Sequence, residues 1–247
     1  MQQPDRDQYF AEISASAARL AEIARTHDPD LPVPTCPDWT LRQLATHIGR
    51  VHRWAAHIVT TRAADYVPFN SVPDGRYPTG PAERAVWLLA GADRLIGAIT
   101  DAGDTPVWAF GRQAPACFWA RRQSHETMVH RADAELAVGC DVVLDADLAA
   151  DGIDEWLQLL SYRPGKPPPT GTGETLHLHC TDRPGEWLLR RTPEDLQIEP
   201  THAKGDVAVR GSGSDLLLVL LHRASPEAVE VLGARPVLDA FLAETAF

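Results

Sequence analysis

The sequence lacks the features of secreted, membrane-spanning and nucleic-acid-binding chains. Its first ten residues, MQQPDRDQYF, have no basic segment followed by an apolar core, so no secretory signal is predicted. The longest purely aliphatic run, Leu216–Leu221, is far shorter than the ~20 residues that span a bilayer. Basic residues are in deficit, because 23 Lys and Arg stand against 34 Asp and Glu for a net charge of −11. That charge disfavours phosphate backbones and anionic membrane surfaces as partners.

Cysteine is scarce and catalytic loop motifs are missing. The four cysteines (Cys36, Cys117, Cys140 and Cys180) form no C-x-x-C pair and no disulfide-framework spacing. They fit a reducing, cytoplasmic location and are interpreted as small buried hydrophobes. The sequence contains no G-x-S-x-G, and the glycines near Gly211 come with no lysine of a phosphate-binding loop. A serine hydrolase and a P-loop enzyme are therefore not supported.

The chain divides into two parts with different patterns. Its 247 residues, 44% of them hydrophobic, allow one large or two small globular domains. Up to residue 160 the periodicity is helical and hairpin signals are absent. A stretch rich in proline and glycine at 161–173 can hold neither a helix nor a central strand, which predicts a linker. We therefore predict a helical domain at 1–160 and a small α+β domain at 174–247.

Five helices are predicted before the linker, and the long ones favour an antiparallel four-helix bundle. The second helix begins after a candidate cap, Asp38 or Thr40, and the third has Pro81 in its first turn. The segment Ala63–Thr79, rich in proline and aromatics, is either a lid or a crossover loop. The predicted helices span residues 6–26, 41–62, 81–102, 115–138 and 147–160.

The second part alternates in short runs that are typical of strands. Residues 175–180 and 186–190 flank a Pro184-Gly185 turn and predict a hairpin. A further strand is predicted at 206–210, followed by a helix at 216–223 that residues 212–215 can cap. Helical character returns from 226 to 244.

Candidate chemistry lies on two of the predicted helices. Glu126 and His130 are four residues apart, about 40° around a helix, so both can reach one metal ion, and Asp133 returns to the same face. His47 lies on the flank of the apolar stripe of the second helix, facing the bundle. His52 and His57 are expected toward the opposite edge or outside the bundle.

Two interpretations of this polar stripe remain open. It either faces solvent or builds a site, because unpaired polar groups in a bundle core are costly. Two imidazoles and one carboxylate from His47, Glu126 and His130 match an open catalytic Zn²⁺ site, although an Fe²⁺ triad has the same ligands. His177 and His179, on one face of a predicted strand, are a weaker metal candidate than an exposed strand surface.

Three long motifs resemble the mycothiol-dependent maleylpyruvate isomerase family, which belongs to the DinB-like metal-binding superfamily. They cover nearly the whole chain in the expected order. One departure occurs at residues 221–223, Leu-His-Arg, where the family often has Trp-Gly-Arg. The motifs are VPTCPDWTLRQLATHIG at 33–49, FWARRQSHETMVHRADAELA at 118–137, and VRGSGSDLLLVLLHR at 209–223.

The resemblance implies a DinB-like bundle that binds a divalent metal, usually zinc, through His47, Glu126 and His130. It also implies a sterol-carrier-like C-terminal domain and mycothiol, an actinobacterial thiol, as cosubstrate. A metal of this kind favours the thiolate, the nucleophilic form of a thiol whose pKa is otherwise about 8.5. The predicted function is thus a cytoplasmic, metal-dependent isomerase or S-transferase acting on a small electrophile.

Further expectations concern the residues around the reaction. Asp133 is expected to orient a ligand or a substrate group. The negative net charge calls for a local cation to hold an anionic substrate, with Arg223 the first candidate and Arg210 the second. The alternatives are a zinc hydrolase that activates water, and a non-catalytic, metal-stabilised protein that binds a lipid or other small molecule. The chain is expected to be a monomer or a weak homodimer.

Overall fold

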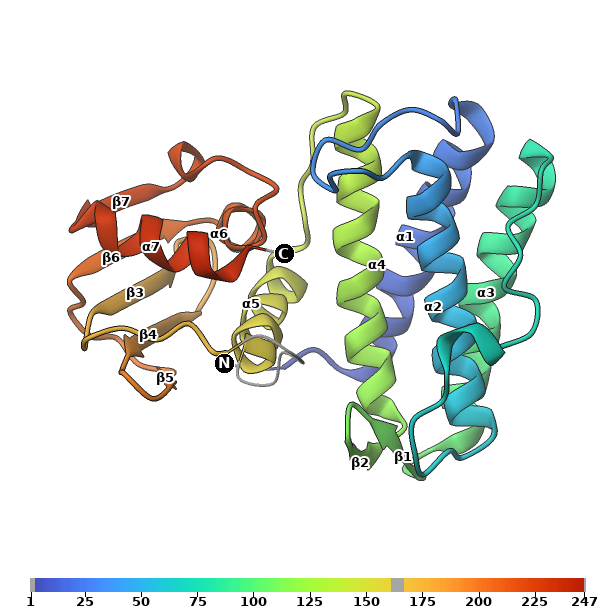
Figure 1. Ribbon diagram of the computed structural model, residues 1–247, viewed down its shortest axis with the longest axis horizontal. Helices are drawn as coiled ribbons and strands as arrows, with labels where there is room; N and C mark the ends of the chain where they lie inside the picture. The colour runs from blue at the N-terminus through green and yellow to red at the C-terminus, as the bar shows by residue number, and fades with distance from the viewer. Residues whose placement is uncertain (1–2, 161–166, 247) are drawn as a thin grey trace. The chain divides into compact units, whose positions relative to one another are not determined.

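The chain folds into two compact units. The computed structural model describes residues 3–160 and 167–246. Asp5–Val142 form the first unit, and the second contains the chain from Val143 onwards with the residues before Asp5. The first unit is helical and the second contains a sheet (Figure 1). The predicted fold class, a helical N-terminal domain followed by an α+β domain, is confirmed.

Four long helices make up most of the first unit. α1 and α2 each pack against both α3 and α4, whereas α1 and α2 have few contacts with each other. The bundle core is mainly aliphatic and includes Ile13, Leu44, Ile48, Leu88 and Leu95, all buried. The helices are α1 (Arg6–Thr26), α2 (Leu41–Thr60), α3 (Pro81–Ala102) and α4 (Cys117–Ala137).

Local capping fixes where these helices begin. The Thr40 hydroxyl accepts a hydrogen bond from the backbone N–H of Gln43, whose side chain accepts one from the Thr40 N–H in return. Asp5 and Gln8 make the same reciprocal pair at α1. Of the two candidate caps for α2, Thr40 is therefore the one used. Pro81 lies in the first turn of α3, as predicted.

A short hairpin between α3 and α4 contradicts the prediction that the first part has none. β1 (Pro106–Ala109) pairs antiparallel with β2 (Arg112–Pro115). Phe110 and Gly111 form its two-residue turn with φ values of 52° and 86°. Positive φ at both turn positions is usually served by Asn-Gly or Asp-Gly. A phenylalanine at the first position hides the turn from sequence patterns.

The segment 63–79 is held against neighbouring helices. The Trp54 indole N–H donates to the carbonyl of Val67, and the Arg50 guanidinium lies over the Phe69 ring. Phe69 begins a short 3₁₀ helix, η1 (Phe69–Ser71). The Trp87 indole N–H donates to the carbonyl of Asp74 from α3. These contacts anchor the segment to α2 and α3.

The second unit is built on a five-stranded sheet with strand order β5-β4-β3-β6-β7. Its pairs are antiparallel except β3 with β6. The predicted hairpin is confirmed as β3–β4, but β5 and β7 were not predicted. The strands are β3 (Thr175–Cys180), β4 (Glu186–Arg191), β5 (Leu196–Glu199), β6 (Val207–Gly211) and β7 (Glu230–Gly233).

Helices pack on this sheet and complete its core. α6 (Gly213–Leu220) and α7 (Arg235–Thr245) contact β3 and β6, and the leucines of α6 are buried among them. Ser212 caps α6, as predicted for this region. A short 3₁₀ helix, η2 (Pro226–Ala228), and β7 occupy part of the stretch predicted to be helical.

The division between the units falls earlier than the expected domain boundary at residue 160. α5 (Ala146–Leu160) packs against α6 and is part of the second unit. The Leu144 N–H donates to the Ser214 hydroxyl, and Gly213 lies close to the backbone of Ala146. The apolar face of α5 is thus buried against α6. Sequence periodicity predicts that a helix has an apolar face, but it does not predict which element packs against that face.

The predicted linker at 161–173 lies partly outside the described residues, which omit 161–166. Its last residues are tied to β4. The N–H groups of Gly171 and Gly173 donate to the carbonyls of Thr192 and Arg191. This part of the stretch is hydrogen-bonded to the end of β4, next to the start of β3.

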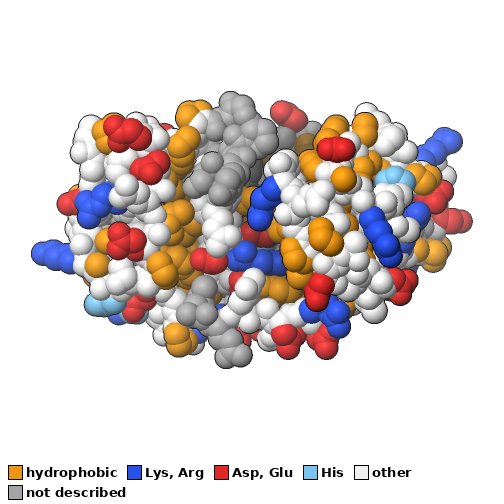
Figure 2. Space-filling view, turned by 90° about the horizontal axis from the view of Figure 1, so that it is seen from below, with side chains coloured by type: hydrophobic (Ala, Val, Ile, Leu, Met, Phe, Trp, Pro, Cys, Tyr) orange, Lys and Arg blue, Asp and Glu red, His pale blue; other side chains and the backbone are white. Residues whose placement is uncertain are grey.

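The distribution of charged side chains and the hydropathy of the helices agree with the overall composition. Acidic and basic side chains are interspersed over the face drawn in Figure 2, with no broad basic patch among the described residues visible there. Among the described helices, none combines the length and apolar character needed to cross a bilayer.

Candidate metal centre

The three predicted metal ligands come together from α2 and α4. His47 Nε2 lies 2.8 Å from Glu126 Oε1, and His130 Nε2 lies 3.5 Å from the same oxygen. One ligand atom from each residue falls within 4.8 Å of the others. The three side chains are partly exposed, by 27%, 24% and 13% for His47, Glu126 and His130. The group is therefore both convergent and accessible.

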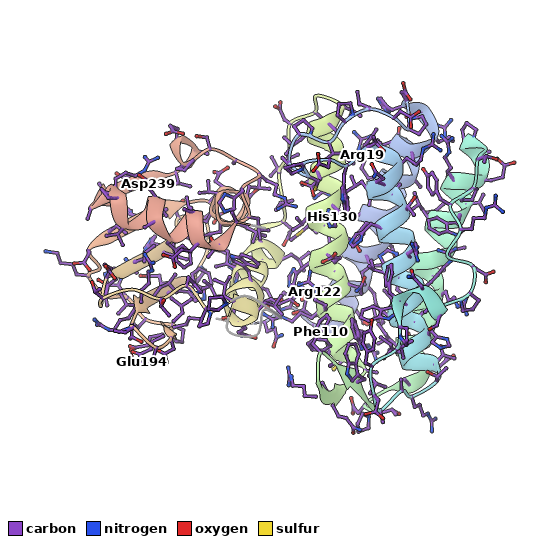
Figure 3. The ribbon with its side chains drawn as sticks, viewed as in Figure 1. Arg19, Phe110, Arg122, His130, Glu194 and Asp239 are labelled. Carbon is purple, nitrogen blue, oxygen red and sulfur yellow. The ribbon has the colours of Figure 1, made fainter. Side chains whose placement is uncertain are left out.

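Glu126 is held as an anion. Arg122, one helical turn earlier on α4, donates to Glu126 Oε2 at 2.5 Å, and Figure 3 labels Arg122 and His130 along this helix. Burial raises the pKa of Glu126, but the Arg122 charge and hydrogen bonds from His130 and His47 outweigh it. The net effect keeps the pKa of Glu126 well below its usual value. One carboxylate oxygen faces the arginine while the other faces both histidines.

Asp133 lies behind His130 and fixes its ring. The Nδ1–H of His130 donates to Asp133 Oδ2 at 2.7 Å, and the Asp133 side chain is fully buried. Burial lowers the pKa of His130, but the bonds to Asp133 and Glu126 raise it well above the usual value. Because Nδ1 is engaged, Nε2 is the nitrogen turned toward Glu126. A carboxylate behind a histidine is the arrangement that orients metal-binding imidazoles.

The loop before α2 supplies further contacts that the sequence analysis did not assign. Thr35 Oγ1 donates to Asp133 Oδ1 at 2.6 Å, and Cys36 Sγ lies 3.3 Å from Asp133 Oδ2. The Trp39 ring stacks on His130 with a centroid distance of 5.9 Å and packs at 5.1 Å from the His47 ring. An indole thus limits the freedom of both imidazoles.

A tight fold of that loop brings these residues to the site. The Val33 N–H donates to the Trp39 carbonyl, and the Trp39 N–H donates to the Cys36 carbonyl. Asp38 adopts a left-handed φ of 69°, a conformation that aspartate tolerates better than most residues. In the sequence, the run Cys-Pro-Asp-Trp predicts a turn but does not predict that its side chains reach the site.

The donor set fits a divalent metal. Two imidazole nitrogens and one carboxylate oxygen are the ligands of open zinc sites, and together they leave a net charge of +1 on the ion. The buried hydrogen bond at His130 Nδ1 leaves the opposite nitrogen to coordinate. Residues His47, Glu126 and His130 would hold the ion, with Asp133 behind them.

The two candidate arginines lie in the second unit. Arg210, on β6, forms a 3.0 Å ion pair with Glu230 of β7 and is 42% exposed. Arg223 follows α6, and its guanidinium donates to the carbonyl of Leu221 at 2.6 Å. Their roles as catalytic cations stay predictions.

The prediction for His52 is wrong. Its side chain is fully buried, and Nε2 lies 2.8 Å from Thr127 Oγ1 on α4. Thr127 itself donates to the Gln123 carbonyl, so its oxygen accepts the hydrogen bond from His52. Burial, with a smaller contribution from Arg53, lowers the pKa of His52 to about 3. His52 is a neutral core residue that joins α2 to α4.

Comparisons with known proteins cover both units. Residues 10–135 match the family model for the mycothiol maleylpyruvate isomerase N-terminal domain, and residues 147–240 match the model for the C-terminal domain of the same family. The fold is similar to the crystal structure of the mycothiol-dependent maleylpyruvate isomerase, at 17% identity and a TM-score of 0.63, covering 94% of this chain and 95% of that one. A mutant of that protein matches at 15% identity with the same TM-score and coverage. No curated protein matches the sequence.

Proposed function

The chain belongs to the mycothiol maleylpyruvate isomerase family, and from that premise we propose that it is a metal-dependent enzyme using mycothiol as thiol cosubstrate. Its substrate is a small electrophilic metabolite, which it isomerises or to which it transfers the thiol. One observation carries the proposal: His47, Glu126 and His130 converge from two helices, and a buried carboxylate fixes the tautomer of His130.

Each side chain at the centre has a distinct task. His47, Glu126 and His130 would bind the ion, and the Asp133 carboxylate keeps the Nδ1 proton of His130 in place. Arg122 neutralises the second oxygen of Glu126 and fixes the rotamer of that carboxylate. Trp39 restricts both rings and shields them from water on its side. A divalent metal, which we expect to be zinc, supplies Lewis acidity that lowers the pKa of a thiol.

The chemistry follows from the thiolate. Its sulfur adds to one carbon of an electron-poor alkene, whose π electrons move onto the activating carbonyl. The former double bond can then rotate. Elimination of the thiolate restores the double bond in the opposite geometry, which is isomerisation without net consumption of thiol. Protonation of the adduct instead retains the sulfur, which is S-transfer.

A turnover screen tests the proposal. Purified protein is incubated with mycothiol and a panel of α,β-unsaturated carboxylates and ketones. In control mixtures either the protein or mycothiol is omitted. Products are separated by chromatography and identified by mass. We expect turnover that requires mycothiol, is lost on chelation, and returns with Zn²⁺.

The variant His47→Ala tests the site directly, because it removes one ligand while α2 is kept. We expect it to lose both turnover and the ion of the N-terminal centre. His27→Ala, at the exposed end of α1, should keep both. If the protein hydrolyses a substrate in the absence of mycothiol, the proposal is wrong and the chain is a zinc hydrolase. Ligand binding with no turnover in any mixture would replace it by a binding protein.

A further inference from the structure

A second group of convergent histidines lies on the sheet of the C-terminal unit. His177 and His179 are on β3, Glu186 begins β4, and His202 lies between β5 and β6. Their ligand atoms fall within 4.8 Å of one another. From the sequence, the His177-x-His179 pair was a weaker metal candidate than an exposed strand face, and Glu186 and His202 were not assigned to it.

Strand register places three of the four residues on one face. His179 pairs directly with Glu186 across the β3–β4 ladder, and His177 lies two residues back on the same side. The alternate positions Leu176 and Leu178 are fully buried on the other side of β3. The polar face is therefore fixed by the same alternation that builds the core.

The fourth residue is carried by an anchored loop. Asp206 Oδ2 accepts 2.8 Å hydrogen bonds from both the N–H and the hydroxyl of Thr175, which ties the end of the loop to the start of β3. His202, four residues earlier, is 77% exposed, yet its Nδ1 reaches Glu186 Oε2. The loop thus delivers an imidazole to a site that the strands have already built.

Three ring nitrogens converge on one oxygen. Glu186 Oε2 lies 2.8 Å from His177 Nε2, 3.3 Å from His179 Nδ1 and 2.5 Å from His202 Nδ1. A carboxylate oxygen offers about two lone-pair positions, so three imidazole N–H donors exceed what it can accept well. If the three histidines instead point unprotonated ring nitrogens at the carboxylate, their lone pairs repel its charge. A bound cation would remove that repulsion. The four ligand atoms lie close enough together to bind one cation in place of these hydrogen bonds.

We propose that His177, His179, His202 and Glu186 form a second divalent-metal site, of a composition that suits tetrahedral zinc. Three neutral imidazoles and one carboxylate give four ligands of the kinds that zinc takes, and they leave a charge of +1 on the ion. Four protein ligands make a closed set, which is typical of structural rather than catalytic sites. The ion would join β3, β4 and the 200–206 loop.

A basic side chain on this face, Arg210, is already engaged. Arg210 pairs with His179 in the parallel β3–β6 register, and its guanidinium is bound by Glu230 of the next strand. Glu230 thereby reduces the repulsion between that guanidinium and a bound cation. The site lies wholly within the second unit, so this inference does not rest on the proposed function of the N-terminal centre.

Metal stoichiometry of the full-length protein tests the inference. Protein stripped with a chelator is titrated with Zn²⁺, and bound metal is measured by mass spectrometry after desalting. We expect about two zinc ions per chain in the wild type and about one in His202→Ala or Glu186→Gln. His202 is exposed and Glu186→Gln keeps its shape, so both variants should fold. His27→Ala, an exposed histidine in the other unit, is the matched control and should keep both ions.

A second arm isolates the site from the N-terminal centre. In a Glu126→Gln/His130→Ala background, Co²⁺ should give the visible absorption of a tetrahedral complex, and adding His202→Ala should weaken binding by about tenfold or more. Stoichiometry that is equal in wild type, His202→Ala and Glu186→Gln would overturn the proposal, and the four residues would then be a hydrogen-bonded surface cluster. If the double-variant background fails to fold, the wild-type comparison alone decides.

Discussion

At the residue scale, Asp133 determines which ring nitrogen of His130 is available to bind a metal. The carboxylate is fully buried and takes hydrogen bonds from Thr35, Cys36 and His130, so both of its oxygens are used. It thereby chooses the tautomer that exposes Nε2 of His130. A single buried acid links the loop before α2 to the reactive face of α4.

Replacing Asp133 should therefore weaken metal binding without unfolding the bundle. In Asp133→Asn the amide can still touch Nδ1 but no longer carries the charge that supports the imidazole. We expect metal affinity to fall by about 10–100-fold, measured by competition with a chromophoric chelator. Asp101→Asn, an exposed position on α3, is the control. Equal affinities in wild type and Asp133→Asn would make Asp133 a purely structural residue.

His52 should make the protein sensitive to acid. Its pKa is about 3 in the folded chain and about 6.5 when unfolded, so the unfolded state binds the extra proton between these values. The free energy of unfolding therefore falls as pH drops below about 6.5. From pH 7 to 4.5 this residue should cost about 2–3 kcal/mol.

His52→Gln should remove that part of the pH dependence, because glutamine keeps a donor for Thr127 but does not titrate. The comparison is between wild type and variant in denaturant titrations at both pH values. His130, whose raised pKa acts in the opposite direction, is common to both proteins. Parallel pH profiles for the two proteins would show that His52 does not cause the acid sensitivity.

At the scale of elements, regular structure could be predicted where local chemistry decides it. The helix bounds follow from apolar periodicity and from caps such as Thr40, and the nearness of His47 to Glu126 and His130 follows from their faces on two packed helices. The β1–β2 hairpin could not be predicted, because Phe110 occupies a turn position that glycine or asparagine usually takes. The positions of Trp39 and Cys36 depend on loop dihedrals, which residue spacing does not report.

Close packing between α2 and α3 yields a prediction at this scale. A Cβ on Gly49 would come within 1.9 Å of the Trp87 ring, so Gly49→Ala forces the helices or the indole apart. We expect a loss of about 1–3 kcal/mol in the free energy of unfolding, from denaturant titration of the full chain. Gly97→Ala on α3, where a Cβ meets nothing within 4 Å, should instead stabilise by about 0.4–1 kcal/mol. Equal effects of the two substitutions would contradict this account.

At the scale of the whole molecule, the net charge and the placement of the metal ligands determine how an anionic substrate could be bound. The chain carries −11, and among the described residues each proposed metal site draws its ligands from one unit, the first from Asp5–Val142 and the second from the other unit. A strongly negative protein repels an anionic substrate at long range, so affinity for one must come from local groups. A metal held by two histidines and one carboxylate retains only +1.

Arg223 is the residue we expect to supply the remaining positive charge. A guanidinium can bind a substrate carboxylate through two parallel hydrogen bonds, which a lysine cannot reproduce. Arg223→Lys should therefore lower turnover by about tenfold or more with metal content unchanged, measured on a substrate from the screen. Arg190→Lys, an exposed arginine on β4, is the control and should leave turnover as it is. The observed bond to the Leu221 carbonyl offers Arg223 a purely structural role at the end of α6. Equal turnover in wild type, Arg223→Lys and Arg223→Ala would assign it that role, and Arg210 would become the arginine to test.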